Sequence, residues 1–257
     1  MSDLLERRTI GESRHQFIYG KANSDRLKQF ELNNPVFVNR DLPMAVYIDN
    51  SDFPQVIKSA EIDIIIAQRM AIEYLNFAIA SRILDNIIMS VDSTLLKNTE
   101  GKFIERINRL FINNDNCQIS NIEELLDVVN SMRGFYKKAY IEYLATGKSI
   151  DNILELPIAF LQIDWFCSHV KRLLNSSGYF ALVFDIKKQM PVLFQQVINN
   201  LISSRINQDI SVKVFCEDTM WTCYYDTNGQ IIEDVHDYGS SYYDNEGLGY
   251  SRSRSVD

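Results

Sequence analysis

Glycine, proline and paired cysteines are scarce in this chain of 257 residues. It contains ten glycines and five prolines, and its four cysteines form no CxxC pair. Few backbone breakers favour helices over an all-β sandwich. Because the cysteines are widely scattered, they argue against a structural zinc site and favour a reduced intracellular setting. They are Cys117, Cys167, Cys216 and Cys223.

The chain also lacks an excess of basic residues and a long uncharged apolar run. Its net charge of −8 implies no broad basic surface, so there is no strong nucleic-acid signal. The chain starts with charged residues and no apolar signal core, and five charged residues interrupt the apolar region 62–91. We therefore expect a cytoplasmic protein that does not insert into a membrane. A protein partner or a homo-oligomer is compatible with this composition.

What is present is an ordinary globular composition, with 46% apolar and 23% charged residues. Compact apolar runs predict strands, and apolar stripes that recur every three to four residues predict helices. The expected strands are 16–20, 43–49, 178–186 and 209–217, followed by a hairpin at 220–235. The expected helices are 24–33, 59–91, 100–113, 120–146, 157–174 and 190–205.

Local signals support several of these boundaries. Ser120 with Glu123 has the spacing of a capping box at the start of a helix. Pro157 stands at a natural first-turn position, and Pro191 lies near the start of the next helix. Asn228-Gly229 predicts the turn of the hairpin.

Alternating strands and helices predict an α/β fold with a parallel sheet flanked by helices. We expect a polar arm at 1–15 and a single domain at 16–239. An all-helical elaboration would occupy about 92–156, unless the long helices simply cover the sheet. The Gly-, Ser- and Tyr-rich segment 240–257 is expected to be a flexible tail.

The segment QFIYGKANSDRLKQFE (16–31) has the layout of a phosphate-binding loop, with an apolar strand, a glycine, small polar residues and a helix. Such a loop reads G-x-x-x-x-G-K-[ST], because its backbone N–H groups, its lysine and its hydroxyl bind phosphates and Mg²⁺. The eight corresponding residues are Gly20, Lys21, Ala22, Asn23, Ser24, Asp25, Arg26 and Leu27.

Three of these eight positions depart from the template. Asp25 replaces the second glycine and adds bulk and negative charge. Arg26 replaces the compact ammonium of lysine, and Leu27 removes the hydroxyl that would hold Mg²⁺. An ordinary strand–turn–helix connection, capped by Ser24 or Asp25, explains the same letters.

A second partial motif follows the strand YFALVFDI. This strand ends in Asp185, where a phosphate-loop ATPase carries the acid that holds Mg²⁺. The next residue is Ile186 rather than the Glu that commonly activates water. Asp185 is therefore a candidate metal acid without a general base, and the alternative is a strand-end residue that caps a turn.

The helix after Asp185 and the segments that follow it carry a family resemblance. The helix has the pattern Q-x-x-[IV]-N-x-L-[IL], and the hairpin leads into VHDYG at 235–239. Over 178–239 the chain resembles bacterial AAA-type ATPases related to origin-recognition proteins. The matching helix residues are Gln195, Val197, Ile198, Asn199, Leu201 and Ile202.

This resemblance implies a P-loop NTPase fold with ATP as the cofactor. It places nucleotide contacts on Gly20 to Leu27 and a metal acid on Asp185, while the altered loop makes Mg²⁺ binding doubtful. No catalytic residue is assigned. We expect a nucleotide-binding or regulatory ATPase-like protein with impaired or lost hydrolysis. The alternatives are a non-enzymatic interaction module built on the same fold, and a working ATPase in which Arg26 contacts phosphate.

Overall fold

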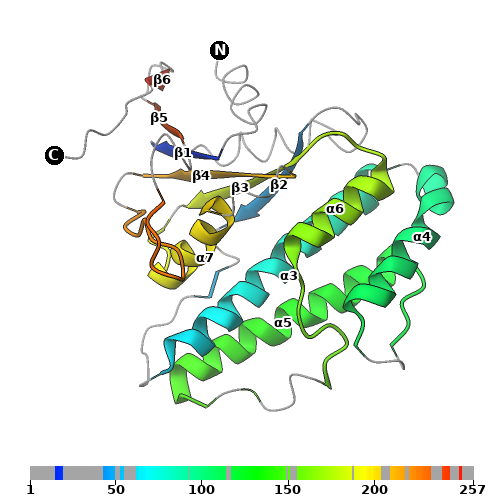
Figure 1. The fold of residues 1–257 in the computed structure, drawn as a ribbon, viewed down its shortest axis with the longest axis horizontal. Coiled ribbons are helices and arrows are strands. Elements are labelled where there is room, and N and C mark those ends of the chain that lie inside the picture. Colours follow the sequence, from blue (N-terminus) through cyan, green and yellow to red (C-terminus); the bar gives the residue numbers. More distant parts are fainter. Residues whose placement is uncertain are drawn as a thin grey trace. The chain divides into compact units, whose positions relative to one another are not determined.

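The fold is drawn in Figure 1 from a computed structural model of the chain. Two compact units form it. The first comprises Met1–Val36, Asp41–Phe53 and Gly178–Asp257, and the second comprises Phe37–Arg40 and Pro54–Ser177. The structure describes residues 15–19, 43–49, 53–54, 62–91, 93–113, 117–148, 150, 155–186, 188–203, 209–217, 220–232, 239–243 and 249–250.

The first unit is built on a six-stranded sheet in the order β2-β3-β4-β1-β5-β6. The neighbours from β2 to β5 pair in parallel, and only β6 is antiparallel. The four strands expected from apolar runs are confirmed. The strands are β1 (Gln16–Tyr19), β2 (Met44–Asp49), β3 (Phe180–Ile186), β4 (Ile210–Cys216), β5 (Gly239–Tyr243) and β6 (Gly249–Tyr250).

Two expectations for the end of the chain need correction. The segment 240–257 is not simply a tail, because β5 pairs in parallel with β1 from Gln16↔Gly239 to Tyr19↔Tyr242. Backbone hydrogen bonds to β1 and β6 hold β5 in the sheet, so its polar sequence carried no apolar signal by which to detect it. The hairpin at 220–235 is reduced, within the described residues, to the isolated bridge Tyr225↔Ile231.

The turn of that reduced hairpin is confirmed. Gly229 has a φ of 79°, a conformation that glycine adopts at little cost. The Asp226 carboxylate accepts hydrogen bonds from the backbone N–H groups of Asn228 and Gln230, at 2.8 Å each. The turn is therefore fixed by a local side-chain cap rather than by a strand ladder.

The two faces of the sheet differ in chemistry. One face is apolar, and Phe53 joins it to helix α7 (Val192–Ser203) through ring contacts with Phe184 and Phe194 at 6.4 and 5.1 Å. The other face combines an apolar cluster around Ile18 with buried polar residues, among them Lys213. Because side chains alternate along a strand, Lys213 and Asp185 belong to this second face.

The second unit is helical and larger than the elaboration expected at about 92–156. It contains α3 (Ile64–Ser90), α4 (Ser93–Phe111), α5 (Ile122–Thr146) and α6 (Ile163–Leu174). Figure 1 shows α3 and α5 lying side by side, and Phe77 stacks on Tyr136 with ring centroids 5.5 Å apart. The broad apolar surface of α3 is thus buried within this unit, which explains why the unit begins before residue 92.

Several predicted helix starts were wrong, and α3 begins at Ile64 rather than at residue 59. α4 begins at Ser93 rather than at residue 100, and α6 begins at Ile163 rather than at Pro157. The cap of α5 is Asn121, whose side chain accepts a hydrogen bond from the Glu124 N–H at 2.8 Å. Glu124 Oε2 in turn accepts the Ser120 N–H at 2.7 Å. The capping pair is therefore displaced by one residue from Ser120 and Glu123.

The segment before α6 stays irregular because α3 and α5 bind its backbone. Leu161 donates its N–H to Glu73 at 3.0 Å and accepts a hydrogen bond from the Asn76 amide at 2.7 Å. The Tyr136 hydroxyl donates to the carbonyl of Ala159. These buried side chains satisfy backbone groups that a helix would otherwise pair internally.

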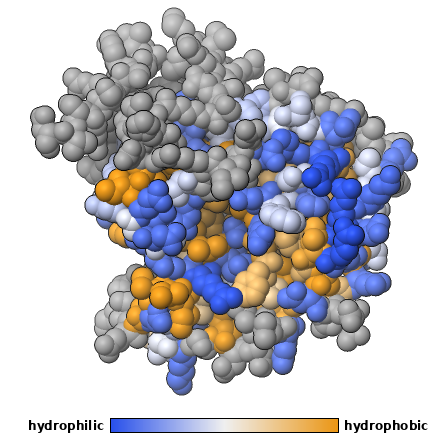
Figure 2. Space-filling model, in the orientation of Figure 1, coloured by the Kyte–Doolittle hydropathy of each residue, from blue (hydrophilic) through white to orange (hydrophobic). Residues whose placement is uncertain are grey.

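Polar and apolar side chains alternate on the surface drawn in Figure 2. None of the described helices is both long and apolar enough to cross a membrane.

Candidate functional site

The candidate site lies at the carboxyl edge of the parallel sheet. The register aligns Asp49, Asp185, Phe215 and Ile18 in one row across β2, β3, β4 and β1. Asp185 is thus two strands from β1, a separation of about 10 Å at ordinary strand spacing. Parallel strands bring these distant parts of the sequence to one edge.

The direction in which successive strands are added to the sheet also changes at this edge. The chain leaves β1 for β2, which lies on the β4 side of β1, and leaves β4 for β5, which lies on the other side. In open α/β sheets, ligands bind outside the carboxyl ends of the strands at such a switch point. The end of β1 is therefore the position where the fold itself favours a ligand.

Asp185 is buried and hydrogen-bonded at the end of β3. Its side chain is fully buried, and its Oδ2 atom accepts a hydrogen bond of 2.5 Å from the Tyr47 hydroxyl. A hydroxyl donor stabilises the charged form of a carboxylate and limits its rotation. This confirms the predicted strand-end position of Asp185 and adds an orienting partner on β2 that the sequence did not reveal.

A buried cation lies on the same sheet face. Lys213 of β4 is fully buried, and its Nζ donates a hydrogen bond of 2.7 Å to Oε1 of Gln16 on β1. Burying an ammonium group is costly unless polar partners surround it. Lys213 is in register with Gln16, the first residue of β1, so this side chain lies at the amino end of β1 and not at the carboxyl edge.

The helix residues that carried the family resemblance have a structural role. Gln195 is fully buried, and its Oε1 accepts the N–H groups of Thr222 and Cys223 at 2.8 and 2.9 Å. One turn later, Asn199 donates to the carbonyls of Cys223 and Tyr225 at 3.0 and 2.8 Å. The pattern Q-x-x-x-N therefore fastens the segment after β4 to α7.

The predicted phosphate-binding loop, Gly20 to Leu27, and the helix expected at 24–33 lie outside the described residues. The structure does establish where the chain leaves β1, because Tyr19 pairs with Cys216 at the carboxyl end of β4. Residue 20 thus follows a strand that ends at the same edge as Asp185. The register therefore places the end of β1 and Asp185 at one edge of the sheet.

The metal prediction concerns Asp185 alone. Among the residues that the structure describes, no group of three or more His, Cys, Asp or Glu could hold a metal ion. Asp49, the register partner of Asp185 on β2, is a second acid at this edge that was not singled out from the sequence. Its position directly after the apolar run of β2 is the signal that could have identified it.

The described histidines have structural partners. Nδ1 of His15 accepts the Val212 N–H at 2.9 Å, and Nδ1 of His169 bonds the carbonyl of Trp165 at 2.7 Å. Neither bond places a histidine at the carboxyl edge of the sheet.

The parallel sheet, the acid at the end of β3 and the change in strand order at β1 are consistent with an α/β protein of the P-loop class. Residues 27–255 match the family described as ORC-CDC6-like. The chain therefore belongs to the ORC-CDC6-like family of AAA+ P-loop ATPases. The match begins at Leu27, the last residue of the candidate loop. No curated protein and no solved structure matches the chain significantly.

Proposed function

We propose that this chain is a nucleotide-binding, regulatory member of its family in which ATP hydrolysis is impaired or lost. The loop Gly20 to Leu27 would contact the phosphates of ATP. Asp185 would stand across the same edge of the sheet, oriented by Tyr47. The single observation that carries the proposal is that an aliphatic residue follows Asp185.

That residue, Ile186, is 2% exposed and ends β3 beside Cys216 of β4. Alternation along the strand directs it to the apolar face of the sheet, together with Phe184. An aliphatic side chain cannot accept a proton from water, so this position offers no general base. The altered loop residues Asp25, Arg26 and Leu27 also favour impaired hydrolysis. They would bind phosphate and Mg²⁺ more weakly than the residues of the template.

ATP binding and turnover should be measured separately. Thermal unfolding is followed with ATP in the presence of Mg²⁺ and in the presence of a chelator, and phosphate release is assayed in parallel. A ligand at a hundredfold excess over its dissociation constant stabilises the folded state by about 2.7 kcal/mol. We expect ATP to raise the unfolding midpoint in both conditions, with no phosphate release above background.

Each other outcome selects another function. No shift at millimolar ATP would favour a non-enzymatic interaction module that keeps the fold as a scaffold. A Mg²⁺-dependent shift with turnover would favour a working ATPase. The variant Asp25→Gly, Arg26→Lys, Leu27→Ser restores the loop template and should bind ATP more tightly with Mg²⁺ than without it. If it ignores ATP, the loop assignment is wrong.

The proposal extends to setting and assembly. Free cysteines among the described residues, three of them buried, support a cytoplasmic location with reduced thiols. A protein partner or a second copy of the chain would suit a regulatory role. Light scattering of the purified chain with and without ATP tests the second copy, and a monomer in both conditions contradicts it.

A further inference from the structure

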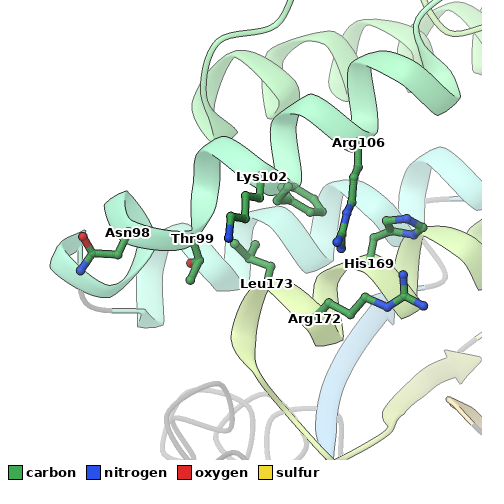
Figure 3. A pocket seen from close by; sticks show the side chains of 8 residues that line it. Asn98, Thr99, Lys102, Arg106, His169, Arg172 and Leu173 are labelled. Carbon is green, nitrogen blue, oxygen red and sulfur yellow. The ribbon is translucent and has the colours of Figure 1, made fainter.

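A hollow between α4 and α6 gathers basic side chains in the helical unit. Its volume is about 280 Å³, and Lys102 and Arg106 line it from α4 while His169 and Arg172 line it from α6. Figure 3 shows that the side chains of the two helices reach toward one another across this hollow. In Figure 2, hydrophilic residues gather over the region of the same two helices.

Helical spacing explains the cluster. Lys102 and Arg106 are four residues apart and so lie on one face of α4, as His169 and Arg172, three apart, do on α6. Phe103 of α4 packs against Phe166 of α6, with ring centroids 6.4 Å apart. This contact holds the two basic faces together.

The lining carries positive charge. Among the residues that the structure describes, no Asp or Glu lines the hollow. On α4, Oε1 of Glu100 instead accepts the N–H of Ile122 at the start of α5 at 2.6 Å. Three permanent cations in one hollow repel one another, and this chain has a net charge of −8. An anion would remove that repulsion.

The side chains that line the hollow narrow the class of ligand. Phe103 and Leu173 are buried at 3% and 6% exposure and give the basic groups an apolar floor. His169 is 8% exposed and its Nδ1 is occupied by the carbonyl of Trp165, which leaves Nε2 as its free ring nitrogen. Planar guanidinium groups bind phosphate oxygens in pairs, whereas a lysine contributes a point charge.

We propose that this hollow binds a small phosphate-bearing anion, with Arg106 and Arg172 gripping the phosphate oxygens from opposite helices and Lys102 adding charge. A nucleic-acid strand is the less suitable source of phosphate. It needs an extended basic track, whereas this site is a single hollow on an acidic chain. The site is made by the helical unit alone, and the proposal does not depend on nucleotide binding at the sheet edge.

Inorganic pyrophosphate is the first probe, titrated into the full chain by calorimetry. Each arginine would contribute a hydrogen bond between charged groups to the binding free energy. Arg106→Gln and Arg172→Gln should therefore each weaken pyrophosphate binding by about tenfold. Arg109→Gln is the matched control, because Arg109 is an exposed residue of α4 that does not line the hollow. It should bind pyrophosphate within about twofold of the unchanged chain.

Two further measurements keep the result unambiguous. Thermal unfolding followed by circular dichroism checks that the variants fold. Arg106→Lys keeps the positive charge but loses the planar guanidinium group, so it should show an intermediate loss of affinity. A labelled single-stranded oligonucleotide is titrated in parallel. Failure of pyrophosphate to bind at millimolar concentration overturns the proposal, as does equal binding by all variants. If the arginine variants lost oligonucleotide binding but bound pyrophosphate like the unchanged chain, the proposal would also be overturned. The hollow would then be assigned to nucleic acid.

Discussion

The Tyr47 hydroxyl donates a hydrogen bond of 2.5 Å to Oδ2 of Asp185, joining the ends of β2 and β3. These residues are 138 positions apart, and the parallel register brings them together. The bond turns a strand-end acid into an oriented one.

Removing the Tyr47 hydroxyl should destabilise the sheet unit. Tyr47→Phe leaves the buried Asp185 carboxylate without this donor, and such a loss costs about 1–3 kcal/mol. Urea unfolding measures the change. Tyr225→Phe is the matched control, because Tyr225 is 49% exposed, and it should change stability by less than about 0.5 kcal/mol. Equal effects of the two variants would show that the Tyr47–Asp185 bond contributes nothing special.

Glu73 should make the stability of the helical unit depend on pH. Burial raises the pKa of Glu73 from 4.5 to about 7, against the lowering effects of the Leu161 hydrogen bond and of Arg69. Because the folded pKa is the higher one, the stabilisation is complete below pH 4.5 and is lost as pH rises through about 7. A shift of this size corresponds to at most about 3 kcal/mol.

Glu73→Gln tests this dependence. The amide keeps an oxygen for the Leu161 N–H but cannot ionise, so the loss of stability between pH 4.5 and 7 should become smaller. Denaturant unfolding at several pH values measures it. A variant whose stability falls with pH as steeply as that of the unchanged chain would rule out Glu73 as the cause.

Gln195→Ala should loosen the segment after β4. It leaves the N–H groups of Thr222 and Cys223 without their shared acceptor, at a cost of about 1–3 kcal/mol for each group that stays buried. Gln196→Ala, one position along α7, is the control and should cost less than about 0.5 kcal/mol. Hydrogen exchange at Thr222 and Cys223 would accelerate only in the first variant. Unchanged exchange there would contradict the assigned role.

The cap of α5 offers a test between two neighbouring residues. Asn121→Ala removes the side-chain acceptor of the Glu124 N–H and should cost about 1 kcal/mol. Ser120→Ala should be nearly neutral, because Ser120 contributes its backbone N–H to Glu124. The reverse order of effects in thermal unfolding would restore Ser120 as the cap.

Deleting the chain from residue 239 onward should expose an edge of the sheet. Without β5, strand β1 loses its parallel partner on one side, and an open strand edge promotes aggregation. A truncation after Tyr250 keeps β5 and β6 and is the control. We expect a lower unfolding midpoint and concentration-dependent light scattering only for the longer deletion. Equal behaviour of the two truncations would mean that β5 adds no stability.

Local signals were sufficient for much of the fold. The apolar runs that became β1 to β4 are buried on both sides, so their composition identified them without any knowledge of partners. Asp185 was found because it directly follows such a run. Helix starts were less certain, since Pro157 and Ser120 suit a first turn equally well whether or not the chain uses them there.

The sequence alone determined strands β1 to β4, the long helices, the acid at the end of β3 and the family resemblance of α7. Tertiary structure decided which of these residues meet. Parallel pairing placed Asp185 beside Tyr47 and Lys213 beside Gln16, and helix packing brought Arg106 toward Arg172. The reason is physical: strand and helix propensity act over a few neighbouring residues, whereas register and packing join positions that no local pattern connects.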